Sequence, residues 1–216
     1  MVQVCLVALL GSGLTQAQVY VGAMGGVATL SGDASSVVNA RGSSFSSYQP
    51  RNGATVELLA GRHCSDYVSL QADYIWNRNP VTLSAGAFLG GTQQGFTETR
   101  SSSQQGVIGD VLVYFRGRNS LLRPYLAVGA GLVHFSSTEE RIIGVGNPTL
   151  PPRTFSATQP ALHVPVGMDV RLGRGWAFRY QFSETITGNP IREQLTPRPP
   201  NSLKNFQSLF GLVKRF

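Results

Sequence analysis

Few side chains in this sequence have the type and spacing needed for chemistry. His134 and Ser136 stand two residues apart, so on a strand both point to the same face, and Glu139 and Glu140 follow them closely. A histidine that removes the proton of a serine hydroxyl, with a carboxylate to orient the imidazole, is what nucleophilic hydrolysis requires. His134 and Ser136 are therefore weak catalytic candidates, and packing at the rim of a strand assembly is the alternative interpretation.

A second group of ionisable side chains is spread over several predicted strands and shares one face of them. Because charges removed from water must be paired, we expect these carboxylates and guanidinium groups to form one network. The network would either fill space and fix the fold or line a narrow ion path. Its members are Glu57, Asp73, Asp110, Asp169, Arg171 and Arg179, with Arg215 and His163 as further candidates.

The sequence predicts no metal, cofactor or nucleic-acid site. Cys5, Cys64 and the three histidines have no spacing typical of structural zinc, and no Gly-rich phosphate loop lies between a strand and a helix. The 18 basic residues give a formal net charge of +7, but they are scattered and form no dense run. Charged residues make up 13% of the 216 residues, about half of the roughly 25% found in soluble proteins.

Alternation of polar and apolar residues predicts the strands that must position these side chains. From Leu162 to Leu172 every second residue is apolar, and in Trp176 to Ser183 and Val68 to Asn77 the large side chains lie mostly on one face. Weaker patterns predict further strands at 19–30, 54–62, 106–116 and 124–136, and a closing strand precedes Phe216.

The connections between these strands are alternately long and short. Turns rich in Gly, Asn, Asp and Ser lie at 63–66, 117–120 and 173–175, whereas polar stretches span 31–54, 79–105, 137–159 and 188–203. Loops longer than about 12 to 15 residues are uncommon in soluble domains. The pattern therefore predicts an all-β fold, an eight-stranded antiparallel up-and-down transmembrane β-barrel with three short periplasmic turns and four long outer loops.

The apolar face of each strand is expected to point outward. The opposite face carries few charges among many small residues, which suits the narrow interior of an eight-stranded barrel better than a soluble exterior. A soluble sandwich with the apolar face in its core is the alternative. Aromatic residues near predicted strand ends would form girdles at the membrane interfaces, namely Tyr74, Trp76, Phe115, Trp176, Phe178 and Phe216.

The first 17 residues differ in character from the rest. An apolar run from Val4 to Leu10 is followed by small residues and by Ala17, which predicts a signal peptide at 1–17 and a barrel domain at 18–216. No Lys or Arg precedes Arg41, so a start further upstream and a buried first strand both stay open.

Three segments, at 123–132, 167–182 and 206–216, resemble eight-stranded outer-membrane barrels of Gram-negative bacteria. The group is similar to the barrel of outer-membrane protein A and to opacity-type surface proteins. The resemblance implies a place in the outer membrane, among its lipid and lipopolysaccharide. It also implies that the barrel-assembly machinery reads Phe210, Leu212 and Phe216, although Lys214 places a charge where an apolar residue is usual.

The same resemblance implies a structural or surface-exposed monomer that is not an enzyme. Its lumen would be filled by side chains, and its mildly basic outer loops would bind ligands or lipopolysaccharide. One alternative is a narrow pore for ions or small solutes. The other is a lipid A-modifying enzyme that uses His134 and Ser136, but Ser137 stands where the deacylase has an asparagine.

Overall fold

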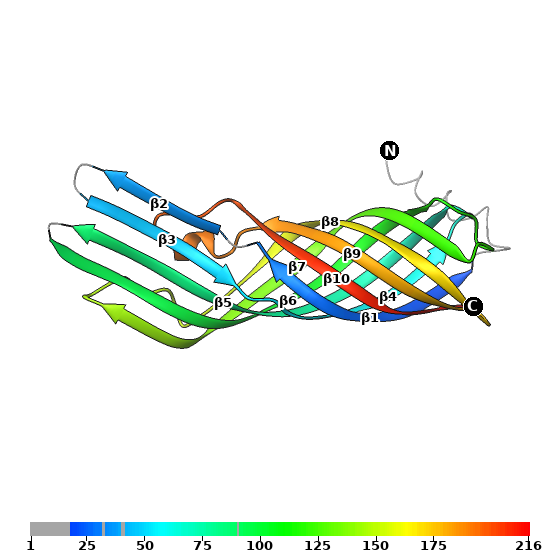
Figure 1. Cartoon of the computed structure of the whole chain (residues 1–216), viewed down its shortest axis with the longest axis horizontal. Coiled ribbons are helices and arrows are strands. Elements are labelled where there is room, and N and C mark those ends of the chain that lie inside the picture. Colours follow the sequence, from blue (N-terminus) through cyan, green and yellow to red (C-terminus); the bar gives the residue numbers. More distant parts are fainter. Residues whose placement is uncertain (1–17, 32, 40–41, 90) are drawn as a thin grey trace, which may run out of the picture.

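The computed structural model describes residues 18–31, 33–39, 42–89 and 91–216, so the predicted signal peptide lies outside the described residues. Within those ranges, the helical content is one short 3-10 helix, and no helix is long and apolar enough to cross a membrane. The elements in chain order (Figure 1) are β1 (Val19–Leu30), β2 (Asp33–Asn39), β3 (Gly42–Pro50), β4 (Gly53–His63), β5 (Val68–Leu89), β6 (Thr92–Tyr114), β7 (Leu122–Val145), β8 (Thr154–Gly173), β9 (Trp176–Gly188), η1 (Arg192–Gln194) and β10 (Ser202–Arg215).

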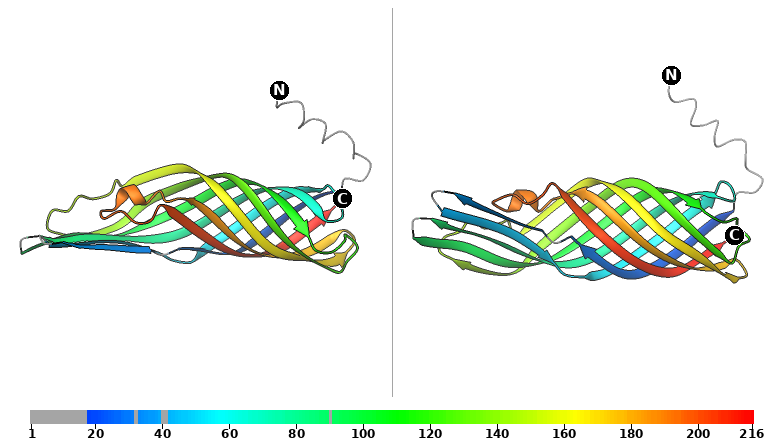
Figure 2. Two further views of the ribbon diagram at one scale, coloured as in Figure 1. Left: turned by 90° about the horizontal axis from the view of Figure 1, so that it is seen from above. Right: turned by 45° about the horizontal axis from the view of Figure 1, so that its top comes forward.

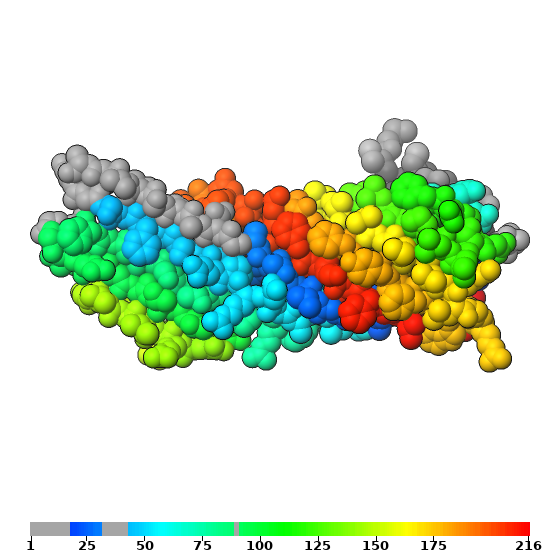
Figure 3. All heavy atoms as spheres, in the orientation of Figure 1, coloured from blue at the N-terminus to red at the C-terminus, as the bar shows by residue number. Residues whose placement is uncertain are grey.

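Eight of the strands close into an antiparallel ring, which confirms the predicted fold class. The ring runs β1, β4, β5, β6, β7, β8, β9, β10 and returns to β1. Tyr20 pairs with Arg215, and the amide of Phe216 donates to the carbonyl oxygen of Val19 at 2.9 Å, so β1 begins and β10 ends at the short-turn end (Figure 1). Seen as spheres, the wall is a continuous layer of side chains on the face that Figure 3 shows.

The stretches predicted as long loops are mostly strands. β5, β6 and β7 contain 22, 23 and 24 residues, about twice the roughly 9 to 11 residues that a strand needs to cross a membrane. β2 and β3 form a hairpin, and β3 pairs with the outer half of β5, so both extend the sheet beyond the ring (Figure 2). Long outer connections are present as predicted. One contains the β2–β3 hairpin, one is the β5–β6 hairpin, one joins β7 and β8 beyond their last pair, Thr138 and Thr154, and the fourth holds η1.

The hairpins were missed because the polarity of the alternation reverses along the strands while its period does not change. Near the short-turn end of β5, Asp73 is buried and Tyr74 is exposed. Further out on the same strand, Val81 and Leu83 are buried, whereas Thr82 is only partly covered. The inward residues of the outer half form one apolar cluster, which contains Leu30, Tyr48, Val81, Leu83, Ala85, Phe96, Phe135, Ile191, Leu195 and Leu203.

Between the short turns and this reversal, the outward face is a band of exposed apolar side chains. Exposed fractions reach 64% for Val107 and 59% for Leu132, and such residues follow one another around the ring. A large exposed apolar surface is unfavourable in water, and an outward apolar band is what a transmembrane barrel presents to lipid.

The predicted girdle and assembly-signal residues lie on this outward face. Exposed at or near the short-turn end are Phe115, Trp176, Phe178, Phe210, Leu212 and Phe216, while exposed Tyr74 and partly covered Trp76 mark the outer edge of the band. Lys214 has a local explanation, because its ammonium group lies 5.2 Å from the ring centroid of Trp176 and donates to the Arg174 carbonyl oxygen at 2.7 Å. The charge thus stays at the rim, where long cationic side chains are tolerated.

The barrel interior requires a glycine beside Tyr125. A Cβ atom at Gly167 would lie 2.5 Å from the carbonyl oxygen of Tyr180 and 2.6 Å from the hydroxyl of Tyr125. We expect Gly167→Val to lower the free energy of unfolding by about 1 to 3 kcal/mol through overpacking. Urea unfolding in detergent micelles, followed by tryptophan fluorescence, measures this change. Gly109→Val is the control, since a Cβ there meets nothing within 4 Å, and an equal loss in both variants would contradict the packing argument.

Candidate functional site

The interior of the ring, here called the lumen, is filled by large polar side chains. Tyr20, Tyr114, Tyr125, Arg123 and Arg179 are each at most 1% exposed. They are inward because strand residues alternate between the two faces of the wall, and in an eight-stranded barrel opposite walls are close enough for such side chains to meet. The predicted charge network therefore lies in an interior that is filled by side chains.

Arg179 on β9 is the centre of the lumen. Its Nε donates to Asp169 Oδ1 at 2.6 Å and its Nη2 to Asp169 Oδ2 at 3.1 Å, a two-point pairing of guanidinium and carboxylate. Arg215 Nη2 donates to Asp169 Oδ2 at 3.0 Å. One carboxylate therefore holds two cations from two neighbouring strands.

Neutral side chains connect Arg179 by hydrogen bonds to the other side of the lumen. Arg179 Nη1 donates to Gln71 Oε1 at 2.8 Å, and the hydroxyl of Tyr20 donates to the same oxygen at 3.0 Å. Arg179 Nη2 also donates to the hydroxyl of Tyr114 at 2.9 Å. Gln71 Nε2 in turn donates to Asp73 Oδ1 at 2.8 Å, so the amide links Arg179 to the acidic residues further out.

The acidic residues lie in the layer beyond Arg179. His163 Nδ1 and Asp110 Oδ2 are 2.8 Å apart. Gln181 Nε2 donates to Glu57 Oε2 at 3.1 Å, and its Oε1 accepts from the hydroxyl of Tyr125 at 2.7 Å. All of these side chains are buried, so this layer, like Arg179, fills the lumen at its height.

Arg123 closes the lumen at the short-turn end. Its guanidinium carbon lies 3.8 Å from the ring centroid of Tyr114, and its Nη2 donates to the carbonyl oxygen of Asp66 at 3.0 Å. The sequence interpretation did not include Arg123, although its alternation with Tyr125 on β7 would have placed it inward.

Five of the six predicted network residues are buried in the lumen, and Arg171 is not. Arg171 has inward parity on β8, but the pairing with β9 shifts between Arg171 and Gly173, where the strand meets its turn, and the side chain is exposed. The structure therefore corrects the prediction for Arg171. Arg215, a further candidate from the sequence, does belong to the network, because it pairs with Asp169 at 3.0 Å.

The predicted catalytic pair lies outside the lumen. His134 is exposed on the outward face of β7, and its Nδ1 contacts Thr158 Oγ1 at 2.9 Å. Ser136 shares that face and is partly covered, while Glu140, the second of the two carboxylates that follow, is exposed. The geometry brings His134 to a threonine of β8 and not to the serine or to a carboxylate.

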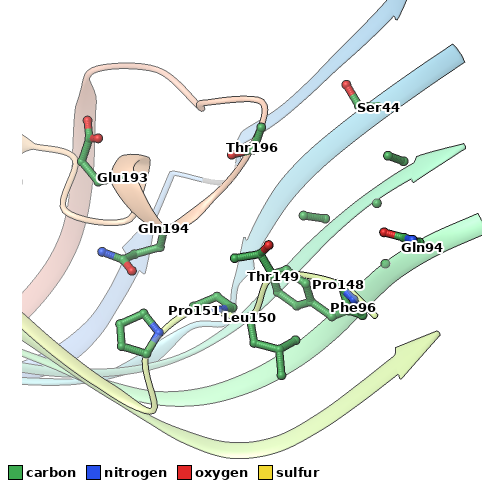
Figure 4. A pocket seen from close by; sticks show the side chains of 15 residues that line it. Ser44, Gln94, Phe96, Pro148, Thr149, Leu150, Pro151, Glu193, Gln194 and Thr196 are labelled. Atoms are coloured by element: carbon green, nitrogen blue, oxygen red, sulfur yellow. The ribbon is translucent and has the colours of Figure 1, made fainter. Parts of the chain in front are cut away.

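A cleft of about 520 Å³ opens among the outer hairpins (Figure 4). The β5–β6 hairpin, the β7–β8 connection and the segment around η1 form its walls. Its lining is mixed, with apolar side chains beside hydroxyl and amide groups and one carboxylate, and includes Phe96, Pro148, Leu150, Thr149, Gln94, Gln194 and Glu193.

Buried Arg100 fixes one wall of this cleft. Its Nη2 donates to the carbonyl oxygens of Pro152 and Arg153, both at 2.9 Å, and its Nε donates to Ser137 Oγ at 3.0 Å. Glu98 pairs with its Nη1. Burial raises the pKa of Glu98 and lowers the pKa of Arg100, and the opposite charge of each partner counteracts this effect.

The sequence matches a family model described as the outer membrane protein beta-barrel domain, over residues 4–216. The chain belongs to this family. It is thus a bacterial outer-membrane β-barrel protein, and its surroundings are the lipid and lipopolysaccharide of that membrane. No curated protein matches the chain in sequence.

Several solved structures are similar to this chain, and Neisserial surface protein A supports the fold. Neisserial surface protein A is similar with a TM-score of 0.53 and 16% identity, over 92% of this chain and 97% of that one. Ail, the attachment invasion locus protein of Yersinia pestis, gives a TM-score of 0.47 and 10% identity, over 92% and 99% of the two chains. The outer membrane protease OmpT of Escherichia coli gives 0.42 and 12%, over 92% and 97%.

The shared carboxylate makes Asp169 the most sensitive position in the lumen. Asp169→Asn leaves Arg179 and Arg215 close together without a counter-charge, so we expect a loss of about 3 to 5 kcal/mol in the free energy of unfolding. Glu193→Gln removes the exposed pair that Glu193 forms with Arg198 at 3.0 Å, and should cost at most about 1 kcal/mol. Urea unfolding of both variants in micelles tests this, and a small effect of Asp169→Asn would show that the pairing is dispensable.

Proposed function

We propose that the protein is a non-conducting surface barrel whose activity resides in its outer hairpins. The observation that carries this is the filling of the lumen: Arg123, Arg179 and the layer of Glu57 and Asp110 block it at successive heights. A pore would need a continuous row of water-accessible polar groups, whereas these are buried, and each is bonded to a neighbouring side chain or backbone group. The buried network then serves as packing that fixes strand register.

A non-enzymatic role follows from the same geometry. A serine nucleophile needs a base within hydrogen-bonding reach, and the nearest bonded partner of the His134 imidazole is Thr158. The outward position of His134 and Ser136 fits a role in packing at the rim of the barrel.

The outer cleft supports a binding role for the hairpins. Its mixed lining of apolar side chains, hydroxyls and amides suits a small ligand that has both an apolar body and uncharged polar groups. Lipopolysaccharide is a second partner for the outer rim, because exposed Arg78 stands on the outward face of β5 directly beyond Trp76, at the height of the headgroup phosphates.

Assembly and oligomeric state follow from β10 and the closed ring. Phe210, Leu212 and Phe216 are exposed along the closing strand, where the barrel-assembly machinery would read them. The ring leaves no unpaired edge in the spanning part, so a monomer is the expected state.

Electrical recording in planar bilayers tests the proposed function. We expect the folded wild type to show no stepwise current. The double variant Arg123→Ala/Tyr114→Ala, which removes the stacked pair nearest the short turns, should also stay closed, because Arg179 and the layer of Glu57 and Asp110 still fill the lumen. Glu193→Gln, altered only in the outer connection, should remain silent. A heat-modifiability gel shows that each sample is folded, and discrete openings by the wild type would contradict the proposal.

A further inference from the structure

Three ligand-type side chains converge in the lumen from different strands. Asp73 lies on β5, Asp110 on β6 and His163 on β8, and their exposed fractions are 2%, 2% and 0%. Each offers one ligand atom, and these atoms all lie within 4.8 Å of one another. Strands β5 and β8 are not neighbours in the ring, so the cluster is made across the lumen.

Each of the three residues has an atom that the protein leaves unbonded. Asp73 Oδ2, Asp110 Oδ1 and His163 Nε2 are buried without a hydrogen-bond partner, whereas the second oxygen of Asp73 accepts from Gln71. Buried polar atoms are nearly always bonded in native proteins. The carboxyl groups of Asp73 and Asp110 also interact directly, so a cation held between these two groups and the imidazole would satisfy all three atoms.

The positive charges of the lumen do not supply that cation. Arg179 and Arg215 are bound to Asp169, and Arg123 stacks on Tyr114 and donates to backbone carbonyl groups. Glu57 adds a further carboxylate to the same layer, bonded to Gln181. His163 is the basic side chain that is hydrogen-bonded within this layer, through Asp110.

We propose that Asp73, Asp110 and His163 bind a divalent transition-metal ion of the zinc class. Two carboxylate oxygens and one imidazole nitrogen are a ligand set that such ions accept, and imidazole disfavours magnesium and calcium. Tetrahedral coordination at bond lengths of about 2.0 to 2.2 Å needs ligand atoms roughly 3.3 to 3.6 Å apart, so side chains whose ligand atoms now lie within 4.8 Å of one another must rotate toward the ion. The ion would neutralise the two aspartates and tie β5, β6 and β8 together.

Zinc uptake during refolding tests the site, because the filled lumen restricts entry afterwards. The chain is unfolded in urea with chelator, freed of chelator and refolded into detergent with zinc chloride. Zinc per chain is then measured after gel filtration, and heat modifiability shows the folded fraction. We expect close to one zinc ion per folded wild-type chain, and a higher temperature for the heat-modifiability shift than in zinc-free protein.

Asp73→Asn and His163→Gln should each lower zinc affinity at least about ten-fold. His134→Gln is the matched control, since this exposed histidine lies outside the lumen and should keep wild-type uptake. Wild-type protein that folds without zinc and retains none, with no thermal shift, would show that Asp73 and Asp110 share a proton instead and would overturn the site. Equal uptake by wild type and both lumen variants would overturn it as well. The wild-type measurements stand even if a variant does not fold.

Discussion

The structure depends on a change of solvent along each strand. A strand has two faces at every height, and the solvent outside the wall decides which of them must be apolar. Where lipid surrounds the barrel, Tyr74 and Val107 point out and Asp73 and Asp110 point in; where water surrounds it, Val81 points in. The same period-two backbone serves both regions because reversing the polarity requires no change of register.

This constraint explains why charged side chains are buried in the lumen. With the apolar positions committed to lipid, the inward positions of the spanning part receive polar side chains, and these can remain buried only when each charge is bonded. Arg179 meets the requirement through Asp169, Gln71 and Tyr114 together. In the layer of Asp73 and Asp110, one oxygen of each carboxyl group has no hydrogen-bond partner. These unbonded oxygens distinguish the layer from the surroundings of Arg179.

The sequence was sufficient to predict the eight strands of the ring, but not the contacts inside the lumen or the extension of the strands beyond the ring. Alternation gave β1 its observed bounds, and it ended the strand from Val68 at Asn77, because the search followed apolar residues on one face and the apolar face changes sides there. Neutral residues such as Gln71 and Gln181 were missed because nothing in their type marks them as links between charges. The approach of His163 to Asp110 joins strands that are not consecutive, so it depends on the tilt and register of the whole ring.

Site-directed spin labelling tests the reversal of polarity most directly. Nitroxides are placed at Tyr74→Cys and Thr82→Cys, both on the outward face of β5, in a background without Cys5 and Cys64 and in lipid bilayers. Oxygen concentrates in lipid, and a water-soluble nickel chelate does not enter it. We expect oxygen to relax the nitroxide at position 74 more strongly than the nickel chelate does, and the nickel chelate to relax the nitroxide at position 82 more strongly than oxygen does. Equal relaxation by the nickel chelate at both positions would contradict the reversal of polarity.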